Sequence, residues 1–307
     1  MKGLVIRNTG SWYQVRTPDG ELVNCKIKGN FRIRDIKSTN PVAVGDSVVF
    51  DTTKEGEGLI SAINDRKNYI VRKPTNLSKQ VQIIAANVDQ VFLIVTINYP
   101  KTFTTFIDRF LATCEAYRVP AKIIVNKTDL YSDEELEYME ALCRLYEQIG
   151  YECFSLSVTE QRGIEPVKDL LNGRISLFSG NSGVGKSSLI NVICPELSLR
   201  TGEISTSHKK GMHTTTFSEM FELEENSYVI DTPGIKGFGT IDFRKEETGH
   251  FFPEIFSTSK DCRFYNCTHI HEPDCAVLKA VAEHRISQSR YQSYLSILED
   301  CNSGKYR

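Results

Sequence analysis

One short segment limits what this chain can fold into more than any other part of it. Residues 180–187 read GNSGVGKS, which satisfies the pattern G-x-x-x-x-G-K-[ST] of phosphate-binding loops. The strand-length run 174–178 precedes the segment, and we expect a helix to begin near Lys186. Glycines let backbone N–H groups curl around phosphate oxygens, and the helix N-terminus adds partial positive charge. The segment therefore predicts an α/β P-loop domain that binds a nucleotide.

The loop motif also assigns roles to its residues. We expect Lys186 to neutralise the β- and γ-phosphates during catalysis, and Ser187 to hold a magnesium ion. The residues expected to contact the nucleotide in this loop and at the start of the helix are Gly180, Asn181, Ser182, Gly183, Val184, Gly185, Lys186, Ser187 and Ser188.

A second motif, D-x-x-G at residues 231–234, follows the apolar run 228–230. An aspartate at the carboxyl end of a strand is suited to hold the magnesium shell, which is the role expected for Asp231. Gly234 can donate its backbone N–H to a γ-phosphate. The tetrapeptide is common by itself, but it is informative at a strand end downstream of a phosphate loop.

A third motif, N-K-x-D at residues 126–129, follows the apolar run 122–125. The carboxylate of Asp129 can accept hydrogen bonds from the ring N–H and the exocyclic amine of guanine, a donor pair that adenine lacks. Lys127 is expected to pack along the base beside Asn126. A further strand, 153–156, leads to a second base-contacting loop at Ser157 and Val158. The motifs together predict GTP as the substrate and argue against an ATPase or a metabolic kinase.

The order of these motifs is unusual. In ordinary GTPases the base-recognition motif lies downstream of the phosphate loop, whereas here Asp129 precedes Gly180 by 51 residues. Domain termini often lie close together, so a circular permutation can reorder the chain and keep the packing. The central region is therefore predicted to be a circularly permuted GTPase domain spanning residues 71–240.

A polar segment at residues 200–216 has the composition of a switch loop that the γ-phosphate orders. Thr214 or Thr215 could complete the magnesium shell, and Thr215 is favoured. His213 is the best residue to orient or deprotonate the attacking water; the alternative is an exposed polar loop residue with no such role. The residue after D-x-x-G is Ile235, where many GTPases use a glutamine. Low intrinsic turnover and stimulation by a partner are the expected consequences.

Three of the nine cysteines crowd into residues 262–275, in the pattern C-x4-C-x-H-x5-C. Three thiolates and one imidazole form the donor set of a closed structural zinc site. The expected ligands are Cys262, Cys267, His269 and Cys275, with His271 as the competitor for His269. Four protein ligands leave no open position for catalysis, so the metal would hold together a small domain at residues 241–307. A final helical run is expected over 276–299.

Residues 1–70 show short alternating apolar runs separated by turn pairs and no helix-length pattern, which predicts a small all-β barrel or sandwich. The stretch 26–37 interleaves bases with apolar residues and is either an RNA-binding face or a solvated strand face. The whole chain carries a net charge of −2 from 39 acids and 37 bases, which excludes wholesale attraction to nucleic acid. We expect no membrane span and no secretory signal, and hence a cytoplasmic protein with reduced thiols.

Taken together, these residues resemble the ribosome small-subunit-dependent GTPase family, known as RsgA, YjeQ or YloQ. The resemblance covers nearly the whole chain. It includes the permuted motifs in order, residues 86–90 (ANVDQ) before the first sheet strand, residues 211–216 (GMHTTT) in the switch, and the Cys/His pattern. Met212 is a departure, because the family usually carries arginine there.

The resemblance implies an OB-fold N-terminal domain, a permuted GTPase and a small α-helical zinc domain. It implies magnesium-dependent hydrolysis of GTP to GDP and phosphate, stimulated by the small ribosomal subunit and its rRNA in late maturation, by a protein expected to be a monomer. It also favours His213 as the catalytic histidine. The alternative hypothesis is a nucleotide-gated RNA-binding module in which hydrolysis is incidental.

Overall fold

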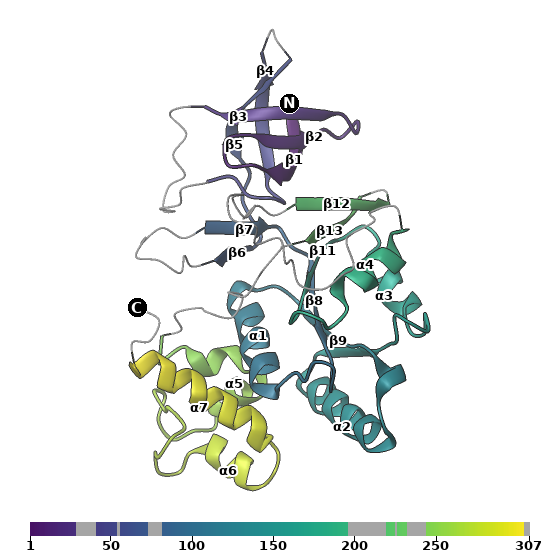
Figure 1. Ribbon diagram of the computed structural model, residues 1–307. Coiled ribbons are helices and arrows are strands. Elements are labelled where there is room, and N and C mark those ends of the chain that lie inside the picture. Colours follow the sequence, from purple (N-terminus) through teal and green to yellow (C-terminus); the bar gives the residue numbers. More distant parts are fainter. Residues whose placement is uncertain are drawn as a thin grey trace.

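The computed structural model describes residues 1–28, 41–53, 56–72, 82–195, 219–224, 226–231 and 244–303. Three parts follow one another through the molecule (Figure 1). A β-barrel lies at one end, an α/β sheet occupies the middle, and the C-terminal helices pack beside α1 at the far end from the barrel. Among the described residues, no helix is both long enough and apolar enough to cross a membrane.

The N-terminal part is a closed five-stranded barrel. Its strands are β1 (Lys2–Asn8), β2 (Tyr13–Arg16), β3 (Leu22–Ile27), β4 (Ser47–Thr52) and β5 (Gly58–Ile63). They pair in the order β1-β2-β3-β5-β4, and β4 pairs back onto β1. Alternate side chains point inward, as the period of a strand requires, and Val5, Tyr13, Phe50 and Ile60 form the buried core. The predicted OB-type barrel is confirmed.

The central part is a doubly wound sheet. Its strands are β8 (Gln90–Val95), β9 (Ala121–Val125), β10 (Glu152–Ser155), β11 (Ile175–Ser179), β12 (Glu219–Glu224) and β13 (Ser227–Asp231). The order is β10-β9-β8-β11-β13-β12, with β12 antiparallel to β13 and the other pairs parallel. The order of strands and helices agrees with the permuted α/β domain predicted from the motifs.

Four helices cover the two faces of this sheet. They are α1 (Thr104–Tyr117), α2 (Asp133–Ile149), α3 (Glu165–Asp169) and α4 (Lys186–Ile193). Helices α1 and α2 pack on one face, and α3 and α4 on the other. Helix α2 begins as its sequence predicts, because Ser132 and Glu135 form a reciprocal capping box.

Strand pairing joins the barrel to the central sheet. Strand β1 pairs with β12 at Arg7 and Glu219, and Arg16 of β2 forms an ion pair with Glu222. A separate hairpin, β6 (Tyr69–Arg72) and β7 (Gln82–Ala86), lies between the barrel and the C-terminal helices. The predicted domain boundaries near residues 70 and 240 stay predictions.

The C-terminal helices are α5 (Pro253–Ser259), α6 (Ala276–Ala282) and α7 (Gln288–Ser303). The prediction of one helical run over 276–299 was wrong, because the chain turns between α6 and α7. His284 has a φ of 57°, a left-handed conformation that ends helices. The N–H of Arg285 bonds to the carbonyl of Ala280 and closes that turn.

Candidate nucleotide site and metal centre

The parallel strands bring the separated motifs to one edge of the sheet. Strands β8, β9, β10, β11 and β13 all run in the same direction, so their carboxyl ends meet at the same edge. The base loop follows β9, the second base loop follows β10, and the phosphate loop follows β11. Asp231 is the last residue of β13. In open α/β sheets, ligands bind at this edge.

Asn126 connects three of these loops. Its side chain is buried, and Nδ2 donates to the carbonyl of Val184 in the phosphate loop at 2.8 Å. Its Oδ1 accepts from the backbone N–H of Val158 in the second base loop at 3.3 Å. The partners are 58 and 32 residues away in sequence, so one side chain holds the predicted phosphate and base sites in a fixed relation.

Asp129 is oriented by the second base loop. The hydroxyl of Ser157 donates to Oδ1 of Asp129 at 2.5 Å and accepts from the N–H of Glu160 at 3.1 Å. The N–H of Thr128 bonds to the carbonyl of Leu156, which ties the two loops together by their backbones. One oxygen of the Asp129 carboxylate therefore has a fixed partner within the protein.

The phosphate loop adopts the geometry that its glycines allow. Gly180 and Gly185 have φ values of 145° and 99°. A Cβ on Gly180 would lie 2.2 Å from the carbonyl oxygen of Ile94, and one on Gly185 would lie 2.3 Å from Nδ2 of Asn126. Both distances are shorter than any real contact, so close approach of neighbouring groups requires glycine at each position.

The remaining loop residues lie as the motif predicts. Helix α4 begins at Lys186, and Nζ of Lys186 donates to the carbonyls of Gly180 and Asn181 at 2.7 Å each. Ser182 and Gly183 are exposed, while Ser187 and Ser188 are half-buried in the first turn of the helix. The ammonium group of Lys186 thus lies beside the loop carbonyls, where its positive charge can bind an anion.

Other predicted residues lie outside the part of the chain that the structure describes. These are Gly234 and the switch residues His213, Thr214 and Thr215. Their roles in magnesium binding and in water activation stay predictions.

Two residues of this region belong to no motif, and no pattern in the sequence points to them. The hydroxyl of Tyr131 donates to the carbonyl of Asn126 at 2.5 Å and accepts from the N–H of Ile97 at 2.9 Å. The carbonyl of Tyr99 accepts from Nζ of Lys127 at 2.5 Å. The contacts of Tyr131 with Ile97 and of Tyr99 with Lys127 join segments about 30 residues apart in sequence, so no local pattern predicts them.

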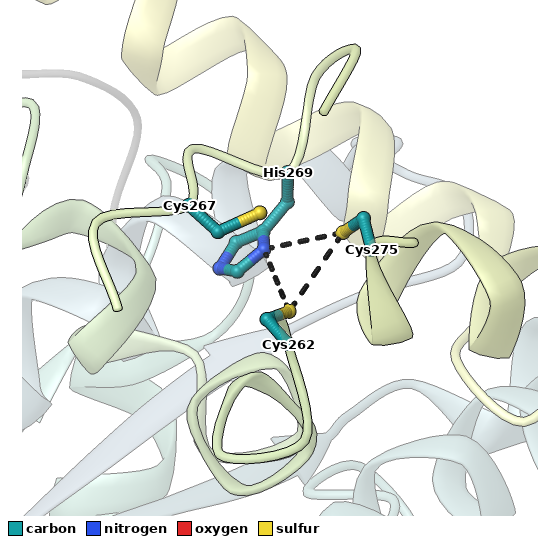
Figure 2. A group of neighbouring side chains, drawn as sticks. All are labelled: Cys262, Cys267, His269 and Cys275. Carbon is teal, nitrogen blue, oxygen red and sulfur yellow. Dashed lines mark hydrogen bonds between the residues drawn. The ribbon is translucent and has the colours of Figure 1, made fainter. Parts of the chain in front are cut away.

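The Cys/His cluster is assembled in the C-terminal part. The donor atoms of Cys262, Cys267, His269 and Cys275 all lie within 4.8 Å of one another (Figure 2). Cys262 Sγ lies 3.7 Å from His269 Nδ1 and 3.9 Å from Cys275 Sγ, and Cys275 Sγ lies 3.5 Å from Nδ1. Ligands around tetrahedral zinc are separated by about 3.6–3.8 Å, given the usual Zn–N and Zn–S lengths. The residues present therefore fit a zinc ion, and His269 rather than the exposed His271 joins the cluster.

Burial favours the neutral forms of these side chains. It raises the pKa of Cys267 to about 12 and lowers the pKa of His269 below its ordinary value of 6.5. A bound cation reverses this preference for the thiols, because a coordinating thiol is deprotonated. The chemistry of the donor set is thus compatible with a zinc site.

The loop that carries His269 is supported from two sides. The carboxylate of Glu272 accepts from the N–H groups of Thr268 and Ile270 at 2.7 and 2.9 Å. Burial raises the pKa of Glu272, but hydrogen bonds from the Thr268 hydroxyl and from these N–H groups outweigh it and hold that pKa well below its usual range. On the other side, Tyr291 and Tyr294 of α7 donate to the carbonyls of His269 and Thr268 at 2.6 and 2.8 Å. These supporting residues carry no spacing signal in the sequence.

The fold and the loop arrangement define the class of protein. A P-loop, a D-x-x-G strand and an N-K-x-D loop share one edge of a parallel sheet, and the N-K-x-D loop comes first in the chain. That combination is a circularly permuted GTPase.

Comparisons with known proteins specify the family. The RsgA GTPase model matches residues 63–241, and the RsgA N-terminal domain model matches residues 2–60. The chain therefore belongs to the RsgA family of GTPases. It is 63% identical to the small ribosomal subunit biogenesis GTPase RsgA of Bacteroides fragilis, over 100% of this chain and 99% of that protein.

Two solved structures share the whole architecture. The crystal structure of YjeQ from Thermotoga maritima matches with a TM-score of 0.81 and 34% identity, over 98% of both chains. The structure of YloQ, described as a circularly permuted GTPase, matches with a TM-score of 0.77 and 30% identity, over 100% of this chain and 96% of that one. The predicted fold class and enzyme class are confirmed.

Proposed function

We propose that this chain hydrolyses GTP to GDP and phosphate as a factor in the biogenesis of the small ribosomal subunit, in late maturation. The observation that carries the nucleotide part is the Asn126 side chain, which joins the phosphate loop to the second base loop. The ribosomal part is supported by the Bacteroides fragilis relative, a small ribosomal subunit biogenesis GTPase that is 63% identical over the full length. The small subunit and its rRNA are the proposed partners, and the subunit is proposed to stimulate hydrolysis.

The phosphate chemistry follows from the loop geometry. Lys186 lies over the loop carbonyls, from which a triphosphate would draw its ammonium group toward the β- and γ-oxygens. Ser187, Asp231 and Thr215 are proposed to hold magnesium, which would supply positive charge to offset the negative charge that develops on the phosphates. His213 is proposed to orient or deprotonate the attacking water.

Base selection is assigned to residues of the base loop and of the second base loop. The other acceptor positions of the Asp129 carboxylate are proposed to accept from the guanine edge, while the Ser157 hydroxyl donates to Oδ1 of the same carboxylate. Lys127 is proposed to lie along the base, and Ser157–Val158 to contact it from the second loop. Asn126 ties the base loop to the phosphate loop through its hydrogen bond to the Val184 carbonyl.

The Cys/His cluster is proposed to hold one structural zinc ion. Four ligands without an open position give the ion a structural role, and the close spacing of the four donors supports this. We further propose a cytoplasmic monomer with boundaries near residues 70 and 240.

The test measures GTP hydrolysis with and without purified small ribosomal subunits, with large subunits as the control. The proposal expects slow hydrolysis by the protein alone and a rise in turnover with small subunits only. The alternative, an RNA-binding module with incidental hydrolysis, expects binding to the subunit with unchanged turnover. Equal turnover in all three conditions contradicts the proposal.

A further inference from the structure

The segment between β8 and α1, residues 96–103, lies against two nucleotide loops although none of its residues belongs to a nucleotide motif. The carbonyl of Tyr99 accepts from Nζ of Lys127, in the base loop, at 2.5 Å. A Cβ placed on Gly183, in the phosphate loop, would lie 3.5 Å from Cδ of Pro100, which is ordinary van der Waals contact. The segment therefore borders the proposed base site and the phosphate site at once.

Two threonines fix the shape of this segment. The hydroxyl of Thr96 donates to the carbonyl of Pro100 at 2.5 Å, and the N–H of Thr102 donates to the carbonyl of Thr96 at 3.0 Å. The hydroxyl of Thr102 accepts from the N–H of Thr96 at 3.2 Å. Thr96 is 1% exposed, so water cannot replace its hydrogen bond. The segment is closed into a loop by its own side chains.

The loop is also anchored to the base side of the site. The N–H of Ile97 donates to the hydroxyl of Tyr131, which in turn donates to the carbonyl of Asn126. Tyr99 has a φ of 61°, a left-handed conformation that tyrosine adopts only when its surroundings impose it. The loop therefore presents the Tyr99 carbonyl in one direction, toward the ammonium group of Lys127.

We propose that residues 96–102 form a further element of the nucleotide site, in which Thr96 is a positioning residue that acts through Lys127. Thr96 holds the turn that presents the Tyr99 carbonyl, and this carbonyl holds the ammonium group, so that the aliphatic part of Lys127 is arranged for the guanine base before the nucleotide arrives. A lysine loses much rotamer freedom when it is fixed, and arranging it beforehand lowers the cost of binding. The inference rests on the proposed role of residues 126–129 in base recognition.

The experiment compares Thr96→Val with Thr96→Ser in the full-length protein. Valine keeps the shape of threonine but leaves the Pro100 carbonyl without its donor, whereas serine keeps the hydroxyl. The dissociation constants of GDP and of inorganic tripolyphosphate are measured for each variant, together with the melting temperature. Tripolyphosphate probes the phosphate loop without a base.

We expect Thr96→Val to weaken GDP binding roughly three- to tenfold, which corresponds to the net free energy of one hydrogen bond. Tripolyphosphate binding should not change, and Thr96→Ser should bind GDP like the wild type. Thr96→Val should also have no further effect in a Lys127→Ala background, because the effect passes through that lysine. Thr102→Val, which removes the acceptor of the Thr96 N–H, provides a second variant if Thr96→Val fails to fold.

Two results overturn the proposal. One is wild-type GDP affinity in Thr96→Val and Thr102→Val. The other is an equal loss of affinity for GDP and for tripolyphosphate, which would show that the substitution acts on the phosphate loop. Failure of the proposed base recognition looks different, because the wild type itself would then bind ADP as tightly as GDP.

Discussion

A buried arginine joins the GTPase domain to the C-terminal helices, and its removal has a predictable cost. Arg290 of α7 is 1% exposed at its side chain. Its Nη1 donates to Asp108 of α1 at 2.9 Å, and its Nε and Nη2 donate to Glu254 of α5 at 2.7 and 3.0 Å. Asp108 also accepts from Tyr146 at 2.8 Å and from Ser293 at 2.6 Å. Every charge in the group has a partner.

We predict that Arg290→Met destabilises the contact between α1 and α7 by about 3–5 kcal/mol, because it leaves the buried carboxylate of Asp108 and the partly buried carboxylate of Glu254 without their cation. Methionine retains most of the apolar volume, so the loss is mainly electrostatic. Arg263→Met is the matched control. Arg263 pairs with Asp274 at 3.0 Å, but both side chains are more than 60% exposed, and such pairs contribute about 0–1 kcal/mol.

The assay is hydrogen exchange measured by mass spectrometry on peptides from α1, α5 and α7. A loss of 3–5 kcal/mol corresponds to a fall in protection of roughly two to three and a half powers of ten. Trp12, the single tryptophan of the chain, lies in the barrel, so its fluorescence reports barrel unfolding separately. Equal protection in Arg290→Met and Arg263→Met would show that Arg290 does not stabilise the contact between α1 and α7.

The same variant has a defined pH dependence. Burial raises the pKa of Asp108 above 3.8, while the charge of Arg290 and hydrogen bonds from Ser293, Arg290 and Tyr146 oppose the rise. Removal of Arg290 raises that pKa further. A carboxyl with a higher pKa in the folded state binds more protons when folded, so stability falls as the pH rises from the unfolded-state to the folded-state pKa. The defect should therefore be larger at pH 8 than at pH 5; an unchanged or opposite trend contradicts this assignment.

Two further predictions concern the phosphate loop and the metal cluster. Gly185→Ala should reduce GDP affinity at least tenfold, because its Cβ would clash with Asn126. The control is Gly173→Ala, a position with a positive φ but with open space around it. This control should lose about 1 kcal/mol of stability and keep normal GDP affinity. Calorimetry with GDP compares them, and equal affinities would show that the clash is harmless. His269→Ala should lose the bound zinc and show faster hydrogen exchange over residues 262–275, while His271→Ala should retain one zinc per chain. Elemental analysis measures the zinc content of both variants. Zinc retained in His269→Ala would exclude His269 as a ligand.

Local signals in the sequence predicted the elements that they control. Ser132 and three following acids predicted the start of α2, and the structure begins that helix at Asp133. The phosphate loop was predicted with its strand and helix because its glycines restrict both neighbours. These features depend on residues close together in the chain, so one sequence is sufficient to predict them.

Long-range contacts could not be predicted in the same way. Arg290 and Asp108 are 182 residues apart, and each alone looks like an exposed charge on a helix. The turn that splits the last helical run depends on packing, since Ile286 is buried in the C-terminal core. The contact of Lys127 with Tyr99 depends on a loop closed by two threonines, which no motif describes.

The base loop precedes the phosphate loop in the chain, and we propose that Asp129 in this loop selects guanine. Replacing GTP with XTP as the substrate tests this selection. Hydrolysis of GTP and of XTP is measured for the wild type, for Asp129→Asn, and for the control Asp133→Asn, which changes a nearby exposed acid on α2. We expect Asp129→Asn to lose GTP hydrolysis and to gain XTP hydrolysis, while the control keeps the wild-type preference for GTP. An unchanged preference for GTP in Asp129→Asn would show that Asp129 does not select the base.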